Sequence, residues 1–263
     1  MNSNNPVFSR GFPDGQRHAT FNVATPDATQ LQDMYNKPAY APPRYMTLDD
    51  VVVRTGATLG TLVVTGALSW ALVAGSPSSG GFALLGALVG FVLALVIAFR
   101  QSTNPALILT YAACEGVFLG AVSQWFNTAY PGIAAQAVIG TVGVFAGMLV
   151  VYKTGAIRVT PKFTRWMLGA LIGVVVLMVA NLVASLFTQD GLGLRDGGPV
   201  AILFSLVCIG VAALSFLLDF DMIDKAIHRG APERFAWYAA FGLTVTLVWL
   251  YLEILRLLSY FRE

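Results

Sequence analysis

Residues 199–218 read PVAILFSLVCIGVAALSFLL, an uncharged run that begins with Pro199 and ends just before Asp219. A helix of about 20 apolar residues is long enough to cross the ~30 Å hydrocarbon core of a bilayer. Pro is tolerated in the first turn of a helix, because the backbone N–H that it lacks would have no partner there. This stretch therefore predicts a membrane-spanning helix.

Six further apolar stretches of near-spanning length alternate with short polar breaks. Because short loops force neighbouring helices to run antiparallel, we predict an all-α membrane protein in which residues 48–260 form a bundle of seven transmembrane helices. Residues 1–47 are rich in Asn, Pro, Thr and Tyr and lack apolar periodicity, so we expect a disordered tail. The predicted helices are 48–75, 81–100, 105–126, 132–152, 163–188, 199–222 and 236–260.

The composition excludes several classes of protein. Charged residues make up 11% of the chain, against about 25% in a soluble domain. The net charge of +2 is too small for a nucleic-acid surface. Both histidines, His18 and His228, fall in polar segments, so no zinc site, haem site or other cofactor is expected in the membrane. Cys114 and Cys208 lie in apolar runs and are predicted to be buried apolar side chains.

The Lys and Arg residues predict the orientation, since cytoplasmic loops carry an excess of them. Of the sixteen, twelve fall on the side of the N-terminus and Arg54 falls inside the first span. We therefore expect a multi-pass plasma-membrane protein with its N-terminus in the cytoplasm and its C-terminus outside. The three on the other side are Arg195, Arg256 and Arg262.

Each of the first five predicted helices contains two glycines one turn apart. In lipid, such pairs let two helix backbones approach closely and gain dispersion contact. We expect them to pack helices together within one chain. The pairs are Gly56/Gly60, Gly86/Gly90, Gly116/Gly120, Gly143/Gly147 and Gly169/Gly173.

A few ionisable side chains lie within the predicted spans, where each costs at least ~2.5–3.5 kcal/mol and usually faces a partner, water or the bundle interior. If the last two helices pivot near Pro232, Asp219 lies 13 residues before the pivot and Thr246 lies 14 after it. These two residues are then at the same height. Glu253 is seven residues further along, about 10 Å away at 1.5 Å per residue, and should not touch Asp219.

Arg54 is predicted to be the counterion of Asp219 or Asp221. These two aspartates are separated by about 200° around a helix, so only one of them can face a shared cavity. Asp221 is also compatible with a solvated charge near Lys225, and Glu253 with a simple pair to Arg256 one turn away.

Glu115 lies near the middle of the third predicted span, with no basic residue within a turn. A carboxyl there either ionises beside water or a cation, or stays protonated. We favour a functional role for it, because buried acids in membranes often mark ion pathways.

Three segments carry a resemblance to the Bax inhibitor-1/YccA family (transmembrane Bax inhibitor motif proteins), in particular to its bacterial branch. They are LTYAACEGVFLG at 109–120, FLLDFDMI at 216–223 and WLYLEILRLL at 249–258. The resemblance implies a seven-helix cation leak channel, best known for Ca²⁺, in which two acidic residues on the sixth and seventh helices share a proton and sense pH. Asp219 matches the first acid, whereas Thr246 stands where the family has the second.

From this resemblance we expect Asp219, Thr246, Arg54 and Arg100 to form a gating and pH-sensing group, with Arg54 or Arg100 latching the aspartate. Two neighbouring carboxylates cannot both ionise cheaply, so a lone Asp219 should respond to pH more weakly or in a shifted range. Another alignment register matches Glu253 to the second acid but needs a seven-residue shift. The expected cation route passes Glu115, Asp221 and Glu253, with weak, transient Ca²⁺ binding at Asp219 and Glu115.

A regulatory membrane protein without a pore is the alternative, with a membrane protease or another stress-response protein as its partner and the N-terminal tail as its docking segment. An enzyme is not expected. An intramembrane aspartyl protease needs a second aspartate on the adjacent helix, and the seventh predicted helix has none. A retinal protein needs a lysine in its last helix, whereas the last lysine of the chain is Lys225.

Overall fold

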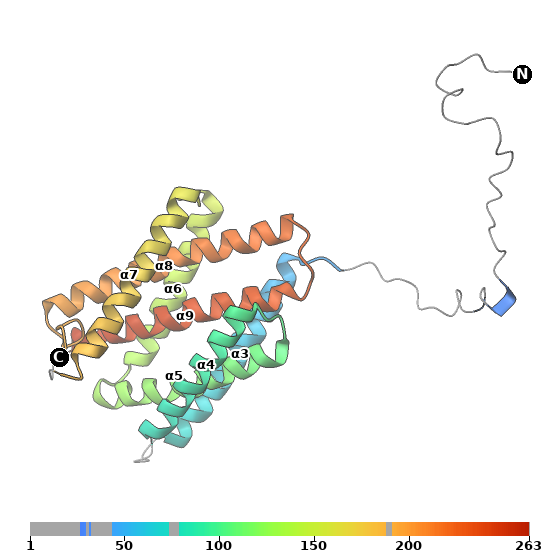
Figure 1. The fold of residues 1–263 in the computed structure, drawn as a ribbon. Coiled ribbons are helices and arrows are strands. Elements are labelled where there is room, and N and C mark those ends of the chain that lie inside the picture. The colour runs from blue at the N-terminus through green and yellow to red at the C-terminus, as the bar shows by residue number, and fades with distance from the viewer. Residues whose placement is uncertain (1–26, 30–31, 33–43, 74–78, 188–190, 263) are drawn as a thin grey trace, which may run out of the picture. The chain divides into compact units, whose positions relative to one another are not determined.

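The computed structural model describes residues 27–29, 32, 44–73, 79–187 and 191–262 of the 263-residue chain. From Arg44 onward the described chain is helical, and the predicted all-α architecture is confirmed (Figure 1). The sixth predicted helix continues past residue 222 to His228. The helices are α3 (Leu48–Val73), α4 (Ser79–Arg100), α5 (Pro105–Ala129), α6 (Ile133–Thr154), α7 (Pro161–Ala184), α8 (Pro199–His228) and α9 (Phe235–Tyr260).

Six of these helices, α3 and α5 to α9, are long and apolar enough to cross a membrane. In α4 the apolar stretch counted over the described residues is Leu84–Arg100, which is shorter than a full span. From Arg44 onward the described residues thus form the seven predicted helices, but only six of these are candidate membrane spans by length and composition. These six helices support a multi-pass membrane protein.

Side chains cap the starts of three helices. At α3, the Thr47 hydroxyl accepts a hydrogen bond from the Asp50 backbone N–H, and the Asp50 carboxylate accepts one from the Thr47 N–H. The Asn104 side chain accepts from the N–H of Ala106 at the start of α5, and the Thr160 hydroxyl accepts from that of Phe163 in α7. Each contact satisfies a backbone N–H that the helix itself leaves without an acceptor.

Helix α9 is the centre of the bundle and packs on α3, α5, α6 and α8 (Figure 1). Its side chains Leu250 and Leu255 are completely buried, and they share an apolar cluster with the completely buried Phe216 of α8. The peripheral helices are α4, which packs mainly on α5, and α7, which packs mainly on α8. The polar groups of α9 must therefore find their partners on neighbouring helices.

The segment directly before α3 is held against the turn between α8 and α9. The Met46 N–H donates to the Ala231 carbonyl at 2.8 Å, and the Glu233 N–H donates to the Arg44 carbonyl at 2.9 Å. The Met46 side chain is buried. From the sequence, residues 1–47 are expected to form a disordered tail. Most of this segment lies outside the described residues, namely 1–26, 30–31 and 33–43. Residues 44–47, in contrast, belong to the compact helical unit.

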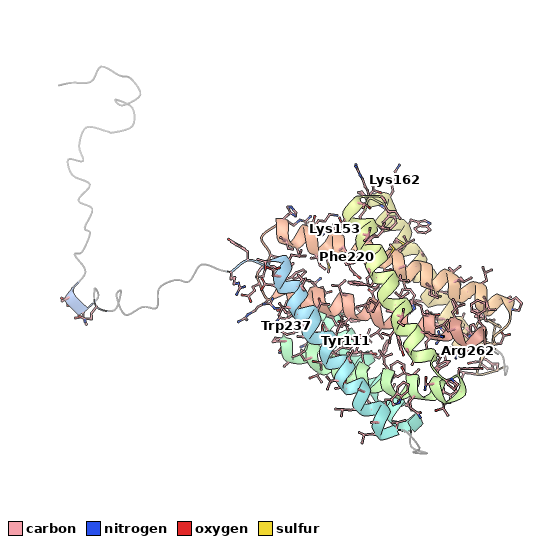
Figure 2. All side chains as sticks on the ribbon, turned by 180° about the vertical axis from the view of Figure 1, so that it is seen from behind. Tyr111, Lys153, Lys162, Phe220, Trp237 and Arg262 are labelled. Atoms are coloured by element: carbon pink, nitrogen blue, oxygen red, sulfur yellow. The ribbon has the colours of Figure 1, made fainter. Side chains whose placement is uncertain are left out.

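Two groups of helix ends can be distinguished by their contacts. The Arg54 end contains the starts of α3, α5 and α9 together with the end of α8. The Arg256 end contains the end of α9, the α5–α6 turn and the α7–α8 loop, and there Arg262 donates hydrogen bonds to the Pro131 carbonyl and the Gln136 side chain. Figure 2 shows Lys153 and Lys162 at the α6–α7 turn, far from Arg262.

The prediction that all five glycine pairs pack helices together is wrong for three of them. A Cβ on Gly116 or Gly120 of α5 would overlap the backbone of α3, and one on Gly86 would lie 3.0 Å from the Cys114 carbonyl oxygen of α5. In contrast, a Cβ on any glycine of the pairs in α3, α6 and α7 would meet nothing within 4 Å. The spacing of the glycines places both members of a pair on one face of their helix, but it does not show whether another helix packs against that face.

This difference predicts opposite effects for two alanine substitutions. Gly120→Ala should destabilise the protein by about 1–3 kcal/mol, because α3 and α5 must move apart to admit the methyl group. Gly147→Ala in α6 should be neutral or slightly stabilising, since alanine is the better helix former and the position is open. Thermal unfolding of both variants in detergent measures the effect, and equal melting temperatures would contradict the observed α3–α5 packing.

Candidate functional site

Asp219 of α8 faces Thr246 of α9, as their equal distance from the Pro232 turn predicts. The Thr246 hydroxyl donates a 2.8 Å hydrogen bond to Asp219 Oδ2 and also approaches the Gly242 carbonyl at 3.2 Å. The Asp219 side chain is half-buried and Thr246 is buried. No Lys, Arg or His nitrogen of the described chain lies within 4 Å of the Asp219 carboxylate. This carboxyl is therefore held by one hydroxyl and has no adjacent counterion.

The other acids near the end of α8 point elsewhere. Asp221 pairs with Lys225 one turn later at 2.5 Å, and Asp224 lies 3.4 Å from His228. Exposed pairs of this kind contribute about 0–1 kcal/mol. The contacts of Asp221 thus favour its interpretation as a surface charge, and the predicted angular separation of Asp219 and Asp221 agrees with their different partners.

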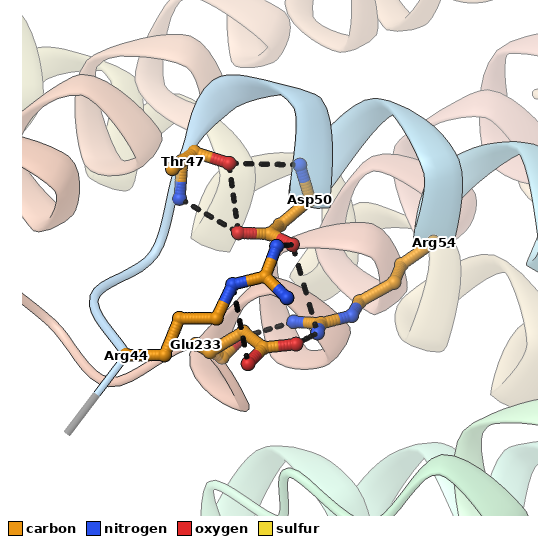
Figure 3. A network of polar contacts seen from close by, with 5 residues as sticks. All are labelled: Arg44, Thr47, Asp50, Arg54 and Glu233. Atoms are coloured by element: carbon orange, nitrogen blue, oxygen red, sulfur yellow. Dashed lines mark hydrogen bonds and ion pairs between the residues drawn. The ribbon is translucent and has the colours of Figure 1, made fainter. Parts of the chain in front are cut away.

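The predicted pairing of Arg54 with Asp219 or Asp221 is wrong. Arg54 binds both the side chain and the backbone carbonyl of Glu233, and its guanidinium lies 3.9 Å from Asp50 on its own helix (Figure 3). Arg44 completes this network by contacting Asp50 at 3.3 Å and Glu233 at 3.7 Å. The network fastens the start of α3 to the turn between α8 and α9, because residues 44–46 bring that turn beside Arg54.

Glu233 is a residue that the sequence reasoning missed. Its signal was its place directly after Pro232, on the same side of the predicted membrane as Arg54. Arg54 also lies above the ring of Trp237, 5.7 Å from its centroid. A cation over an aromatic face gains about 0.5–1 kcal/mol at exposed sites and more when desolvated.

Arg100, the other predicted latch, is exposed at the end of α4. No acidic side chain of the described residues lies within 4 Å of its guanidinium. Neither of the two predicted arginines therefore contacts Asp219.

Glu115 of α5 is half-buried and points toward α4. A Cβ atom on Gly90 of α4 would lie only 3.0 Å from Oε1 of Glu115. Glu115 makes no hydrogen bond or ion pair with the described residues. The absence of a side chain at Gly90 leaves the space that the carboxyl occupies.

Glu253 of α9 belongs to a separate charge cluster at the Arg256 end. Its Oε1 accepts from Arg256 at 2.9 Å, which confirms the predicted local pair, and from Arg195 of the α7–α8 loop at 3.4 Å. The carboxyl is only 2% exposed, and its Oε2 has no hydrogen-bond partner among the described residues. Burial, followed by the nearby Arg256, lowers the pKa of Arg195. With two arginines on one carboxylate, Glu253 has little charge left for a cation.

Further polar pairs connect α9 to its neighbours at other heights. Thr244 contacts Thr58 of α3 at 3.4 Å, and the Tyr251 and Ser123 hydroxyls share a 2.6 Å hydrogen bond between α9 and α5. Together with Asp219 and Glu253, they give α9 a polar contact to α3, α5, α8 and the α7–α8 loop.

The described surface contains an apolar groove and a polar cavity. The apolar groove of about 590 Å³ lies between α3 and α6, and the polar cavity of about 630 Å³ lies beside Arg54, Arg234 and Trp237 at the Arg54 end. Neither of these two is lined by Asp219 or Glu115. Within the described residues, no three His, Cys, Asp or Glu side chains come together as a metal site would require.

The contribution of the buried Glu253 carboxylate to stability can be tested against that of an exposed carboxylate, Asp224. Glu253→Gln should destabilise the protein by about 2–3 kcal/mol, somewhat less than the loss of a fully buried pair because both arginines reach solvent. Asp224→Asn removes an exposed carboxylate of α8 and should change stability by less than about 1 kcal/mol. Melting temperatures measured together test this, and a Glu253→Gln variant as stable as the parent would contradict the assignment of Glu253 as a structural anchor.

Comparison with known proteins supports the resemblance noted from the motifs. The family model described as Bax inhibitor 1 like matches residues 5–263. A search of curated proteins finds no match to the chain. Because the family match covers nearly the entire sequence, including all seven helices, this protein belongs to the Bax inhibitor 1 like family.

Proposed function

We propose that this protein is a pH-modulated cation leak channel, with Ca²⁺ as its main ion and Asp219 as part of its gate. One observation carries the proposal. Asp219 lies in a helix that is long and apolar enough to span a membrane, yet among the described residues its carboxylate has only the Thr246 hydroxyl as a hydrogen-bond partner and no basic nitrogen within 4 Å. Membership of the Bax inhibitor 1 like family supports this choice of function.

A buried charge is costly in a membrane. An ionised carboxylate in hydrocarbon is costly unless a cation, water or several donors compensate it. One hydroxyl supplies only part of that compensation. A cation passing Asp219, or a proton bound to it, supplies the rest, so the residue can respond both to cation flux and to pH.

Asp219 and Glu115 are the carboxylates left free to meet a passing cation, because Asp221 is paired with Lys225 and Glu253 with two arginines. Ca²⁺ takes six to eight oxygen ligands. Two separated carboxylates provide too few for tight binding, so the proposed channel binds Ca²⁺ weakly and transiently, as a leak pathway requires.

The proposed membrane arrangement uses all seven helices, α3 to α9, as spans of the plasma membrane. The excess of Lys and Arg on the side of the N-terminus places that terminus in the cytoplasm. The Arg54–Glu233 network then lies at the cytoplasmic end, and the Glu253 cluster at the outer end. Because neither described cavity is lined by Asp219 or Glu115, the structure corresponds to a closed channel in this proposal.

The observation that neither Asp219 nor Glu115 lines the apolar groove or the polar cavity also favours a second candidate, a membrane regulatory protein without a pore. Such a protein would act on a membrane protease or another stress-response partner through its surface. In that case Asp219 would serve only to hold α8 against α9 through Thr246.

The channel proposal predicts that Asp219→Asn lowers Ca²⁺ flux into reconstituted liposomes by about tenfold, since it removes a negative charge whose attraction for a nearby cation is taken as about 1.4 kcal/mol. Asp221→Asn, two residues away on a different face of the same helix, should retain the parental flux.

Intact folding of both variants is checked by their melting temperatures. Parental flux in Asp219→Asn, or no flux above protein-free liposomes in the parent protein, would reject the channel in favour of the regulatory role.

A further inference from the structure

The groove between α3 and α6 is a lateral opening in the bundle. These two helices pack on α5 and α9 more than on each other, and their separation leaves the volume of about 590 Å³. Val63 of α3 and Val138 and Val142 of α6 line its exposed edges. The buried side chains of Leu119 and Val248, from α5 and α9, lie deeper. The volume falls within the ~300–1,000 Å³ typical of small-molecule sites.

The groove occupies one half of the bundle's depth. It extends along α3 from Leu59 to Trp70, close to the C-terminal end of that helix at Val73, and along α6 from Ala134 to Val142. Eleven residues of helix α3 correspond to about 16 Å. Trp is enriched where a membrane meets water. The groove therefore runs from near the middle of the membrane to the interface at the Arg256 end.

The lining of the groove is almost entirely apolar. The three hydroxyl groups of the lining already make hydrogen bonds within the protein: Ser123 shares one with Tyr251, and the Thr141 hydroxyl donates to the Ala137 carbonyl. A lining that is otherwise almost entirely apolar is poorly suited to water. The side chains that flank the groove are exposed and belong to helices that can cross a membrane.

We propose that this groove is a binding site for one acyl chain of a bilayer lipid from the leaflet at the Arg256 end. Hydrocarbon is the material that surrounds these exposed faces, and a flexible chain can fill an irregular space that packed side chains leave open. The lining gains dispersion contacts that an empty groove lacks. A chain in the groove is surrounded by α3, α5, α6 and α9, whereas a lipid on a flat helix face has protein on one side only.

The site is independent of the proposed channel, because none of its lining residues belongs to the Asp219–Thr246 pair. A chain seated there separates α3 from α6 and supports the face of α9 that carries Leu247, Val248 and Tyr251. Lipid binding can therefore be tested without any measurement of ion flux.

The test uses the full-length protein in vesicles of phosphatidylcholine that contain a photoactivatable diazirine in the acyl chain. After irradiation, mass spectrometry of peptides locates the adducts. We expect about fivefold more adduct per residue in the groove than on the exposed face of α7, because a fivefold preference needs only a small difference in binding free energy. Val63→Trp and Val138→Trp fill the groove and should reduce its adducts to the level of α7.

The three valines chosen are all exposed, so their replacement should not disturb the core. Val63 and Val138 are 63% and 51% exposed, and the control Val176 of α7 is 58% exposed. Val176→Trp should leave groove labelling unchanged. Equal labelling of groove and α7, or groove labelling that persists in both filled variants, would overturn the proposal. A disulfide-linked dimer formed on oxidation of a Val63→Cys variant, and not of the parent protein with its two free cysteines, would also overturn it and identify a second copy as the occupant.

Discussion

The fold depends on one constraint: polar groups of the central helix α9 must be satisfied by protein, since hydrocarbon offers no hydrogen bonds. The helix meets this constraint for three of its hydroxyl groups by pairing Thr244 with Thr58, Thr246 with Asp219, and Tyr251 with Ser123. Trp249 Nε1 and Glu253 Oε2 of the same helix have no hydrogen-bond partner among the described residues. Each pair connects α9 to a different neighbour. The pairs thereby fix how α3, α5 and α8 are placed around it, while apolar packing supplies most of the contact area.

The ionic groups are distributed unevenly along this frame. Toward the two ends of α9, carboxylates are matched by arginines, with Glu233 bound by Arg54 and Glu253 bound by Arg195 and Arg256. Between them, Asp219 has a hydroxyl and no arginine. The carboxylates near the two ends of α9 are thus paired with arginines, whereas the Asp219 carboxylate at an intermediate height is not. The proposed gate requires this arrangement. The lipid groove lies against another face of α9 and adds a second way in which the position of this helix can be affected.

Much of the fold could be predicted from the sequence because its signals are local. The lengths of the apolar stretches predicted the helices, Pro199 marked the start of α8, and the distances from Pro232 paired Asp219 with Thr246. The partner of Arg54 could not be found in this way, because Glu233 reaches it only after residues 44–46 pair with the α8–α9 turn.

The same limit applies to contacts between elements that are distant in sequence. Arg195 reaches Glu253 because the α7–α8 loop lies against α9, although its position as the one basic residue of that loop was a usable signal. Glycine spacing identified five pairs, but of these ten glycines only Gly86, Gly90, Gly116 and Gly120 face another helix. Which face of a helix is covered is a property of the assembled bundle.

The most direct test is to replace Thr246 by an aspartate, because the family resemblance implies a second acid at this position, next to Asp219. Two carboxylates at hydrogen-bond distance share a proton, because both cannot ionise cheaply. Thr246→Asp should therefore make Ca²⁺ flux depend much more steeply on pH between about pH 5 and 8 than in the parent protein, whereas Thr246→Asn should not. A pH profile of Thr246→Asp that matches the parent would contradict the assignment of the Asp219–Thr246 pair as the gate.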